Sequence, residues 1–240
     1  EDWDGQPRLV GVREDIETIV EQFPTSRYAM ITFDSEAIMR VPITSDSTAV
    51  ISAARTLRQE ITSGSSGSSV GTASAMLSEV MSANFDETKK AVVFFFSDGE
   101  QTSAQPRESY EAAGLFVDAG LVLGYGTEEG APMRIRSGYS EEGEGNYIVG
   151  ADGEVGISTI DEVNLQQIAE ELNVEYVKRN PGSPLNVAPG GDGSLIGEVS
   201  TNSVSVFGLY WVFALLVIVG MLLLLADFIV RAMRTRRAVL

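Results

Sequence analysis

Apolar residues along this chain fall either into runs typical of buried strands or into stripes typical of amphipathic helices. The clearest run, 91–97, is almost continuously apolar up to Ser97 and then stops at Asp98, Gly99 and Glu100. A strand buried on both faces of a parallel sheet needs such continuous hydrophobicity. Because ligands of open α/β sheets bind outside the carboxyl ends of the strands, Asp98 lies where a functional group is expected. Taken alone, the same residues also fit a strand followed by an ordinary Asp-Gly turn.

Similar patterns predict the other elements of the fold. Further strands are expected at 28–33, 37–42, 121–125 and 174–176, and Pro42 places the second of these at a sheet edge. A helix is expected near 108–118, and four stripes with helical spacing predict further helices: Val12, Ile16, Ile19 and Phe23; Val50, Ala54, Leu57 and Ile61; Val70, Ala73, Leu77 and Val80; and Leu165, Ile168, Ala169 and Leu172. Strands that alternate with helices predict an α/β fold, a doubly wound and mostly parallel sheet with helices on both faces.

The order of these elements has one gap at its beginning. A doubly wound domain normally starts with its central strand, whereas this chain begins at Glu1 and its first clear element is the helix that ends at Pro24. We therefore expect the sheet to lack its first strand. Residues 1–180 alone are then expected to expose an apolar gap and to fold poorly.

The last 37 residues differ in character from the rest of the chain. Residues 204–226 carry no charge, and at about 1.5 Å per residue a helix of this length spans a hydrocarbon core of about 30 Å. Four arginines lie in the tail 227–240, so the positive-inside rule predicts a cytoplasmic C-terminus, with residues 1–203 outside the cytoplasm. Residues 180–203 are rich in Gly, Pro and Ser and are predicted to link this single transmembrane helix to the folded domain, residues 1–179.

Composition narrows the possible chemistry. The chain has neither Cys nor His, which excludes thiol nucleophiles, disulfides, His bases and the usual zinc sites. Any bound metal would therefore be a hard cation held by carboxylates, hydroxyls and water. Once the four tail arginines and Asp227 are set aside, residues 1–203 carry 13 Lys and Arg against 33 Asp and Glu, a net charge of −20. Such a surface repels nucleic acid and attracts cations or basic partners, and it also fits a role in solubility alone.

Two loops have the composition of ligand-binding motifs. The Ser/Gly-rich residues 63–72 directly precede a predicted helix, where free N–H groups and hydroxyls suit an anion or a cation; a flexible loop with a Ser N-cap fits them equally well. They lack the Gly-Lys-Ser/Thr ending of a P-loop, which argues against a nucleoside triphosphate. Residues 124–130 mimic a dinucleotide fingerprint, but the third glycine comes one residue late and no long helix pattern follows, so a turn is favoured.

The serine-rich loop before a helix, followed by the strand that ends at Ser97-Asp98-Gly99, resembles a von Willebrand factor A (VWA) domain. Residues 27–34 look like the second strand of that family. Residues 165–177 resemble the closing helix and strand of its membrane-anchored bacterial members. The resemblance covers residues 8–179 and starts after the family's Asp-x-Ser-x-Ser motif.

The resemblance implies a metal-ion-dependent adhesion site. In the family this site uses the Asp-x-Ser-x-Ser motif after the first strand, a Thr or Ser from a second loop, and an Asp after a central strand. Carried over to this chain, Ser68 is the second-loop hydroxyl, with Thr72 as a less favoured substitute, and Asp98 is the later Asp. The Asp-x-Ser-x-Ser segment has no counterpart here, so Ser68 and Asp98 form half of a site. The implied ion is Mg²⁺, or else Mn²⁺ or Ca²⁺, with a partner's acidic side chain completing its shell.

These observations predict a binding module without catalytic residues rather than an enzyme. We expect a single-pass membrane protein whose VWA-like domain engages a protein partner outside the cytoplasm through a divalent metal, with no role for nucleic acid. One alternative is a scaffold or assembly subunit of an envelope complex that binds without metal. The other is an enzyme that acts on a nucleotide or phosphate ester.

Overall fold

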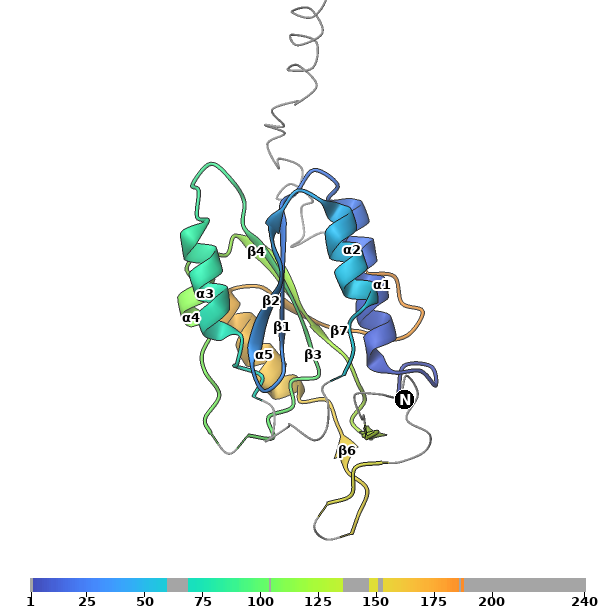
Figure 1. Ribbon diagram of the computed structural model, residues 1–240. Helices are drawn as coiled ribbons and strands as arrows, with labels where there is room; N and C mark the ends of the chain where they lie inside the picture. The colour runs from blue at the N-terminus through green and yellow to red at the C-terminus, as the bar shows by residue number, and fades with distance from the viewer. Residues whose placement is uncertain are drawn as a thin grey trace, which may run out of the picture. The chain divides into compact units, whose positions relative to one another are not determined.

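The computed structural model describes residues 2–59, 69–103, 105–135, 147–150, 153–185 and 187 (Figure 1). The chain divides into two compact units, residues 1–200 and 201–240, and all of the described residues belong to the first. Ser68 and the predicted transmembrane segment 204–226 therefore lie outside the described residues. Within the described ranges, no helix combines the length and the apolar character that a membrane crossing requires.

The first part of the described chain consists of a helix, a β-hairpin and a second helix in sequence order. Its elements are α1 (Arg8–Gln22), β1 (Tyr28–Phe33), β2 (Ala37–Thr44) and α2 (Ser47–Arg55). The two strands pair antiparallel, with Phe33 opposite Ala37. Among the described residues β2 pairs only with β1, so it is the edge strand that Pro42 predicts.

The second part contains a parallel sheet. Its elements are α3 (Ser74–Ala83), β3 (Val92–Ser97), α4 (Glu111–Gly114), β4 (Ala119–Gly124), β5 (Ala131–Pro132), β6 (Ile157–Ser158), α5 (Glu162–Leu172) and β7 (Glu175–Lys178). Strands β3, β4 and β7 pair in parallel in that order, and β5 and β6 form a short antiparallel pair. The expected mixed α/β fold with a parallel sheet is confirmed.

Helices cover both faces of the parallel sheet. Figure 1 shows α1 and α2 on one side of the strands and α3, α4 and α5 on the other. All six residues of β4 are buried. Val122 packs into the cluster that contains the α5 stripe, whereas Leu121 and Leu123 pack with Ile19 of α1. This two-sided burial is what the uninterrupted apolar runs predict.

Packing extends beyond residue 179, into the range that the sequence predicts as a linker. Leu185 is 8% exposed and Val187 is 2% exposed, and both join the cluster that contains Leu121, Leu123 and Tyr125. The Gly-, Pro- and Ser-rich composition of residues 180–203 gives no sign of this packing. The packed unit therefore reaches at least Val187.

Three of the predicted helices differ in their bounds from the helices in the structure. The helix expected near 108–118 shrinks to α4, which ends at Gly114; a Cβ on Gly114 would be 2.1 Å from the carbonyl oxygen of Glu171 in α5. The stripe that begins at Val50 extends past the end of α2, which is Arg55. The stripe from Val70 begins before α3, because Val70 is buried in the preceding turn.

The strands do not form one continuous sheet. Among the described residues, β1 pairs only with β2, and β3 pairs only with β4. Side chains, rather than backbone hydrogen bonds, join the two sheets: the Phe33 and Phe95 rings stack with centroids 5.5 Å apart, and Ile31 packs on the same cluster. Among the described residues, the hairpin is thus attached to the parallel sheet by side-chain packing.

This division predicts unequal protection of backbone amides from hydrogen exchange. We expect amides of β1 to exchange at least about tenfold faster than those of β4, because β4 has a ladder partner on each side and β1 has one. Peptide-resolved exchange on the full chain, read by mass spectrometry, measures both strands in one experiment. Equal protection of β1 and β4 would show that the two sheets open as one unit.

Candidate functional site

Asp98 lies directly after β3, at the carboxyl end of the parallel sheet. Its backbone oxygen accepts a 2.7 Å hydrogen bond from the N–H of Asp161, which caps the start of α5. Gly99 has φ +76°, and a Cβ there would lie 2.4 Å from the Asp161 carbonyl oxygen, so this turn requires glycine. The chain therefore holds Asp98 at the edge where ligands of such sheets bind.

Arg8, the first residue of α1, reaches this carboxylate. Its Nη1 lies 2.9 Å from Asp98 Oδ2 and also donates to the hydroxyl of Ser158 in β6 at 2.9 Å. That hydroxyl in turn donates to Asp98 Oδ2 at 3.3 Å. Three segments far apart in sequence, the start of α1, the end of β3 and β6, thus meet at one point.

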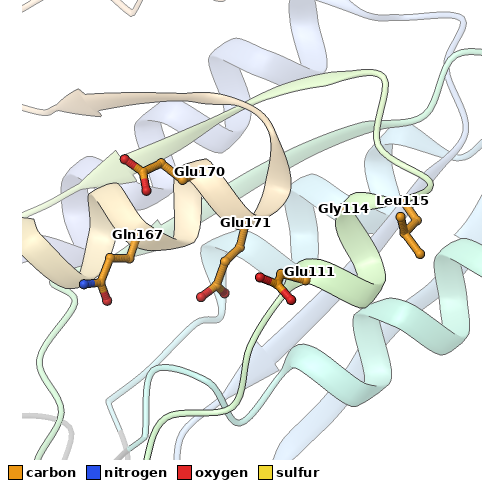
Figure 2. Close-up of a pocket in the computed structure, with 6 residues that line it drawn as sticks. All are labelled: Glu111, Gly114, Leu115, Gln167, Glu170 and Glu171. Atoms are coloured by element: carbon orange, nitrogen blue, oxygen red, sulfur yellow. The ribbon is translucent and has the colours of Figure 1, made fainter.

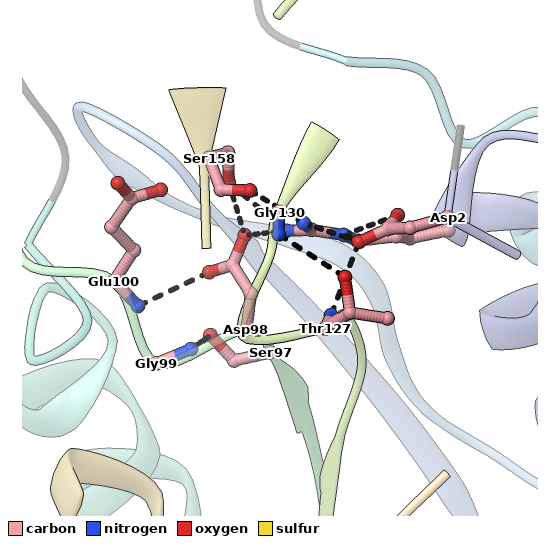
Figure 3. A network of polar contacts seen from close by, with 9 residues as sticks. Asp2, Ser97, Asp98, Gly99, Glu100, Thr127, Gly130 and Ser158 are labelled. Carbon is pink, nitrogen blue, oxygen red and sulfur yellow. Dashed lines mark hydrogen bonds and ion pairs between the residues drawn. The ribbon is translucent and has the colours of Figure 1, made fainter. Parts of the chain in front are cut away.

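Asp2 completes the surroundings of the guanidinium (Figure 3). Arg8 Nε donates to Asp2 Oδ1 at 2.9 Å, Nη2 donates to Asp2 Oδ2 at 2.7 Å, and Nη2 also donates to the backbone oxygen of Ser158 at 2.8 Å. A guanidinium has five N–H groups, and these contacts occupy all of them. The Arg8 and Asp2 side chains are 16% and 8% exposed, whereas Asp98 is 33% exposed.

In this network, charge pairing has a larger effect than burial on the pKa values of Arg8 and Asp2. Burial alone would lower the pKa of Arg8, but the hydrogen bond to Asp2 and the charges of Asp98 and Asp2 leave that pKa raised. Burial would likewise raise the pKa of Asp2, but its bonds to Arg8 leave that pKa lowered. Both side chains therefore stay ionised and paired at neutral pH.

Glu100 adds a further acidic group beside Asp98. Its backbone N–H donates to Asp98 Oδ1 at 3.2 Å. Burial raises the pKa of the Glu100 carboxyl, and the nearby charges of Asp98 and Asp161 raise it further, while Ser158 and Arg8 act in the opposite direction. The site thus contains one cation among several carboxylates.

The serine-rich loop is tied to the Asp98 loop at its described end. The backbone N–H of Val70 donates to the Gln101 side-chain oxygen at 3.0 Å. Thr72 lies in the turn before α3, where its hydroxyl donates to the Ser69 carbonyl oxygen at 2.8 Å. Ser68 itself is outside the described residues, so its part in a site stays a prediction. The described end of the serine-rich loop thus contacts the loop that follows Asp98.

The described residues do not fit a divalent ion beside Asp98. Mg²⁺ requires about six oxygens in octahedral geometry, whereas a guanidinium lies against Asp98 Oδ2. In the part of the chain that the structure describes, no group of three or more acidic side chains is placed to hold a metal ion. A second cation at Asp98 would meet the positive charge of Arg8, which lies 2.9 Å from Asp98 Oδ2.

Asp98 is a candidate from its place after a buried strand, whereas no sequence pattern points to Arg8, Asp2 or Ser158. Their contacts to one another join residues up to 150 positions apart, which no spacing motif records. One local signal exists for Arg8. It occupies the first helical position after Pro7, where the helix dipole favours an acid and disfavours a cation. An arginine in that position indicates a partner elsewhere in the fold.

A hollow lies between α4 and α5, away from Asp98 (Figure 2). Its lining residues are Glu111, Gly114, Leu115, Gln167, Glu170 and Glu171. Glu171 is at the far end of α5 from Asp161, about 15 Å along the helix. Its carboxylate is paired with Arg107 and accepts the N–H of Tyr110 at 2.6 Å. These contacts give Glu171 a structural role in joining α5 to the segment before α4.

Comparisons with known proteins agree with this fold. The von Willebrand factor type A domain family matches residues 2–101, and the curated proteins gave no match. The crystal structure of the conserved hypothetical protein BatB from Bacteroides thetaiotaomicron is similar with a TM-score of 0.58 and 23% identity, over 74% of this chain and 82% of that one. An aerotolerance-related membrane protein from Bacteroides fragilis is similar with a TM-score of 0.57 and 23% identity, over 74% of this chain and 84% of that one. Through its fold and the match over residues 2–101, this chain is similar to von Willebrand factor type A domains.

Proposed function

We propose that this chain is a binding module that engages a protein partner through the loops after β3 and β4. The observation that carries the proposal is the exposure of Asp98. Its side chain is 33% exposed, whereas Arg8 and Asp2 beneath it are largely buried. The network therefore presents one carboxylate to solvent at the edge of the sheet where ligands bind in such folds.

Binding fits the charges of this site better than catalysis does. The cation of the network is an arginine, which does not release its proton at any physiological pH. Asp98 is paired with that arginine, and the chain has no Cys or His to act as nucleophile or base. The groups are fixed by one another, which suits recognition of a partner's surface.

Two forms of this function differ in their need for metal. The form that the geometry supports best needs none, because Arg8 already neutralises Asp98. The metal-assisted form, with Ser68 and Asp98 as ligands and Mg²⁺ as the ion, is supported by the contact between Gln101 and Val70 that brings the serine-rich loop to the Asp98 loop. Chelation separates the two forms.

We further propose that residues 204–226 anchor the module in a membrane. The four arginines of the tail 227–240 would then lie in the cytoplasm, and residues 1–203 outside it. The membrane protein from Bacteroides fragilis with a similar fold supports a membrane location for this chain.

Site-specific photo-crosslinking in cells tests the proposed function on the full chain. A crosslinker at exposed Glu128, in the loop after β4, is expected to capture one defined protein, whereas a crosslinker at exposed Glu79 of α3 is not. Asp98→Asn is expected to reduce capture at least about tenfold, because it removes the partly exposed carboxylate that the network presents to the partner. EDTA treatment of permeabilised cells should leave capture unchanged.

Asp86→Asn is the matched control for Asp98→Asn. Asp86 is also an ion-paired aspartate, bonded to Lys89 at 2.6 Å, but it precedes β3 and so lies near the opposite end of that strand. Its substitution should not change capture. Equal loss in both variants, or equal capture at Glu79 and Glu128, would contradict the proposed surface. Loss of capture in EDTA alone would favour the metal-assisted form.

A further inference from the structure

The Arg8 side chain is held in place by the fold, unlike the side chain of a surface arginine. Every N–H of its guanidinium has an acceptor, shared among Asp2, Asp98 and Ser158. Gly126, with φ +126°, leaves the space that the guanidinium fills, because a Cβ there would lie 2.8 Å from Arg8 Cζ. The fold thus provides both the charges and the room for this one side chain.

We propose that Arg8 is the resident cation of the Asp98 site, and that it excludes a divalent metal ion for as long as it is in place. This inference concerns the same loop surface as the proposed function and depends on it in no other way. It explains why a carboxylate at this position of the sheet needs no metal to be neutralised. It also names Arg8 as the residue that decides whether the site responds to Mg²⁺ or Mn²⁺.

The competition follows from charge and from geometry. A metal ion at Asp98 Oδ2 would have to take the position of Nη1, which lies 2.9 Å from that oxygen. Displacing the guanidinium would break its bonds to Asp2 as well, and would leave a buried carboxylate without its cation. Magnesium also loses its water shell reluctantly. The lost ion pairs and the cost of dehydrating the metal ion both favour the arginine over the metal at this site.

Removing the arginine should reverse this preference. Arg8→Gln leaves the carboxylates of Asp2 and Asp98 and the hydroxyl of Ser158 around a space that holds no positive charge. Hard divalent ions bind through one or two carboxylates together with water. The variant is therefore expected to bind Mn²⁺ where the wild-type chain does not.

Mn²⁺ binding by the full chain in detergent, read by electron paramagnetic resonance, tests the proposal. Wild type is expected to show no Mn²⁺ binding that depends on Asp98. Arg8→Gln is expected to gain an Mn²⁺ site whose affinity falls at least about tenfold in Arg8→Gln combined with Asp98→Asn. Arg55→Gln removes the same charge from the exposed Arg55–Glu17 pair and should behave as wild type. Arg8→Lys retains the cation and should stay without bound metal.

Two results would overturn the inference: Mn²⁺ binding by wild type that Asp98→Asn abolishes, or a folded Arg8→Gln chain that binds no more Mn²⁺ than Arg55→Gln does. Should Arg8→Gln fail to fold, the nuclear magnetic resonance signal of the Arg8 Nε–H group in the wild-type chain provides the test. The loss of this signal in Arg8→Lys assigns it to Arg8. That signal is expected to stay sharp when one equivalent of Mn²⁺ is added, and broadening would contradict exclusion. Because these readouts need no partner, they can succeed or fail independently of the crosslinking experiment.

Discussion

Replacing Arg179 with methionine is expected to cost about 3–5 kcal/mol of the free energy of unfolding, because it leaves Asp15 as an unpaired buried charge. Arg179 Nε and Nη2 donate to the two carboxylate oxygens of Asp15 at 2.7 and 2.9 Å, and the Tyr125 hydroxyl donates to the same carboxylate at 2.6 Å. The Arg179 and Asp15 side chains are 5% and 7% exposed. This pair ties the residue after β7 to α1 in the interior.

Fluorescence of Trp3 provides the measurement. Trp3 is buried with its ring centroid 5.5 Å from that of Tyr125, and Trp211→Phe makes it the single tryptophan of the full chain. In that background Arg179→Met should lower the melting temperature by roughly 6–20 °C. Burial raises the pKa of the Tyr125 hydroxyl, so this donor keeps its proton throughout the neutral range.

Arg55→Met is the control, since it breaks an ion pair whose side chains are 65% and 32% exposed. Exposed pairs contribute at most about 1 kcal/mol, so its melting temperature should stay within roughly 4 °C of the parent. Asp15→Leu combined with Arg179→Met should recover part of the loss, because both charges leave together. Equal melting temperatures for Arg179→Met and Arg55→Met would show that the buried pair is not what joins these elements.

The sequence predicts the central elements of the fold well, for a physical reason. Residues 92–97 and 119–124 are apolar on both strand faces, and only a strand between two helical layers uses such a run. The α5 stripe is also confirmed, because Leu165, Ile168, Ala169 and Leu172 are all buried. The helix expected near 108–118 is longer than α4, and no residue spacing signals that Gly114 packs against the backbone of α5.

The candidate site was predictable only in part. Asp98 follows an unmistakable strand, so its place at the sheet edge could be expected from the sequence. Arg8 has no motif around it, and its partner Asp98 is 90 residues away. The closeness of these two charges depends on how α1 packs against the sheet, which residue spacing does not encode. The family resemblance implies a metal ion beside Asp98, which stays a prediction, and it gives no sign of the guanidinium that lies there.

Gly120→Ala is expected to cost more than about 4 kcal/mol, enough to prevent stable folding of the parallel sheet. Gly120 pairs with Val93 across β3 and β4, and a Cβ on it would lie 1.9 Å from the Val93 carbonyl oxygen. Backbone cannot yield as the end of a flexible side chain can, so the two strands would have to separate. The backbone of Gly120 also has φ +153°, a conformation that residues other than glycine rarely adopt.

Gly182→Ala separates the effect of the positive φ from the effect of the steric clash. Gly182 has φ +73° but no atom within 4 Å of the Cβ position, so alanine there should cost only roughly 1–2 kcal/mol through backbone strain. Soluble yield and the Trp3 unfolding transition, compared between the two variants, give the measurement. A Gly120→Ala chain as stable as Gly182→Ala would mean that β3 and β4 can move apart without loss, and that their pairing does not hold Asp98 in place.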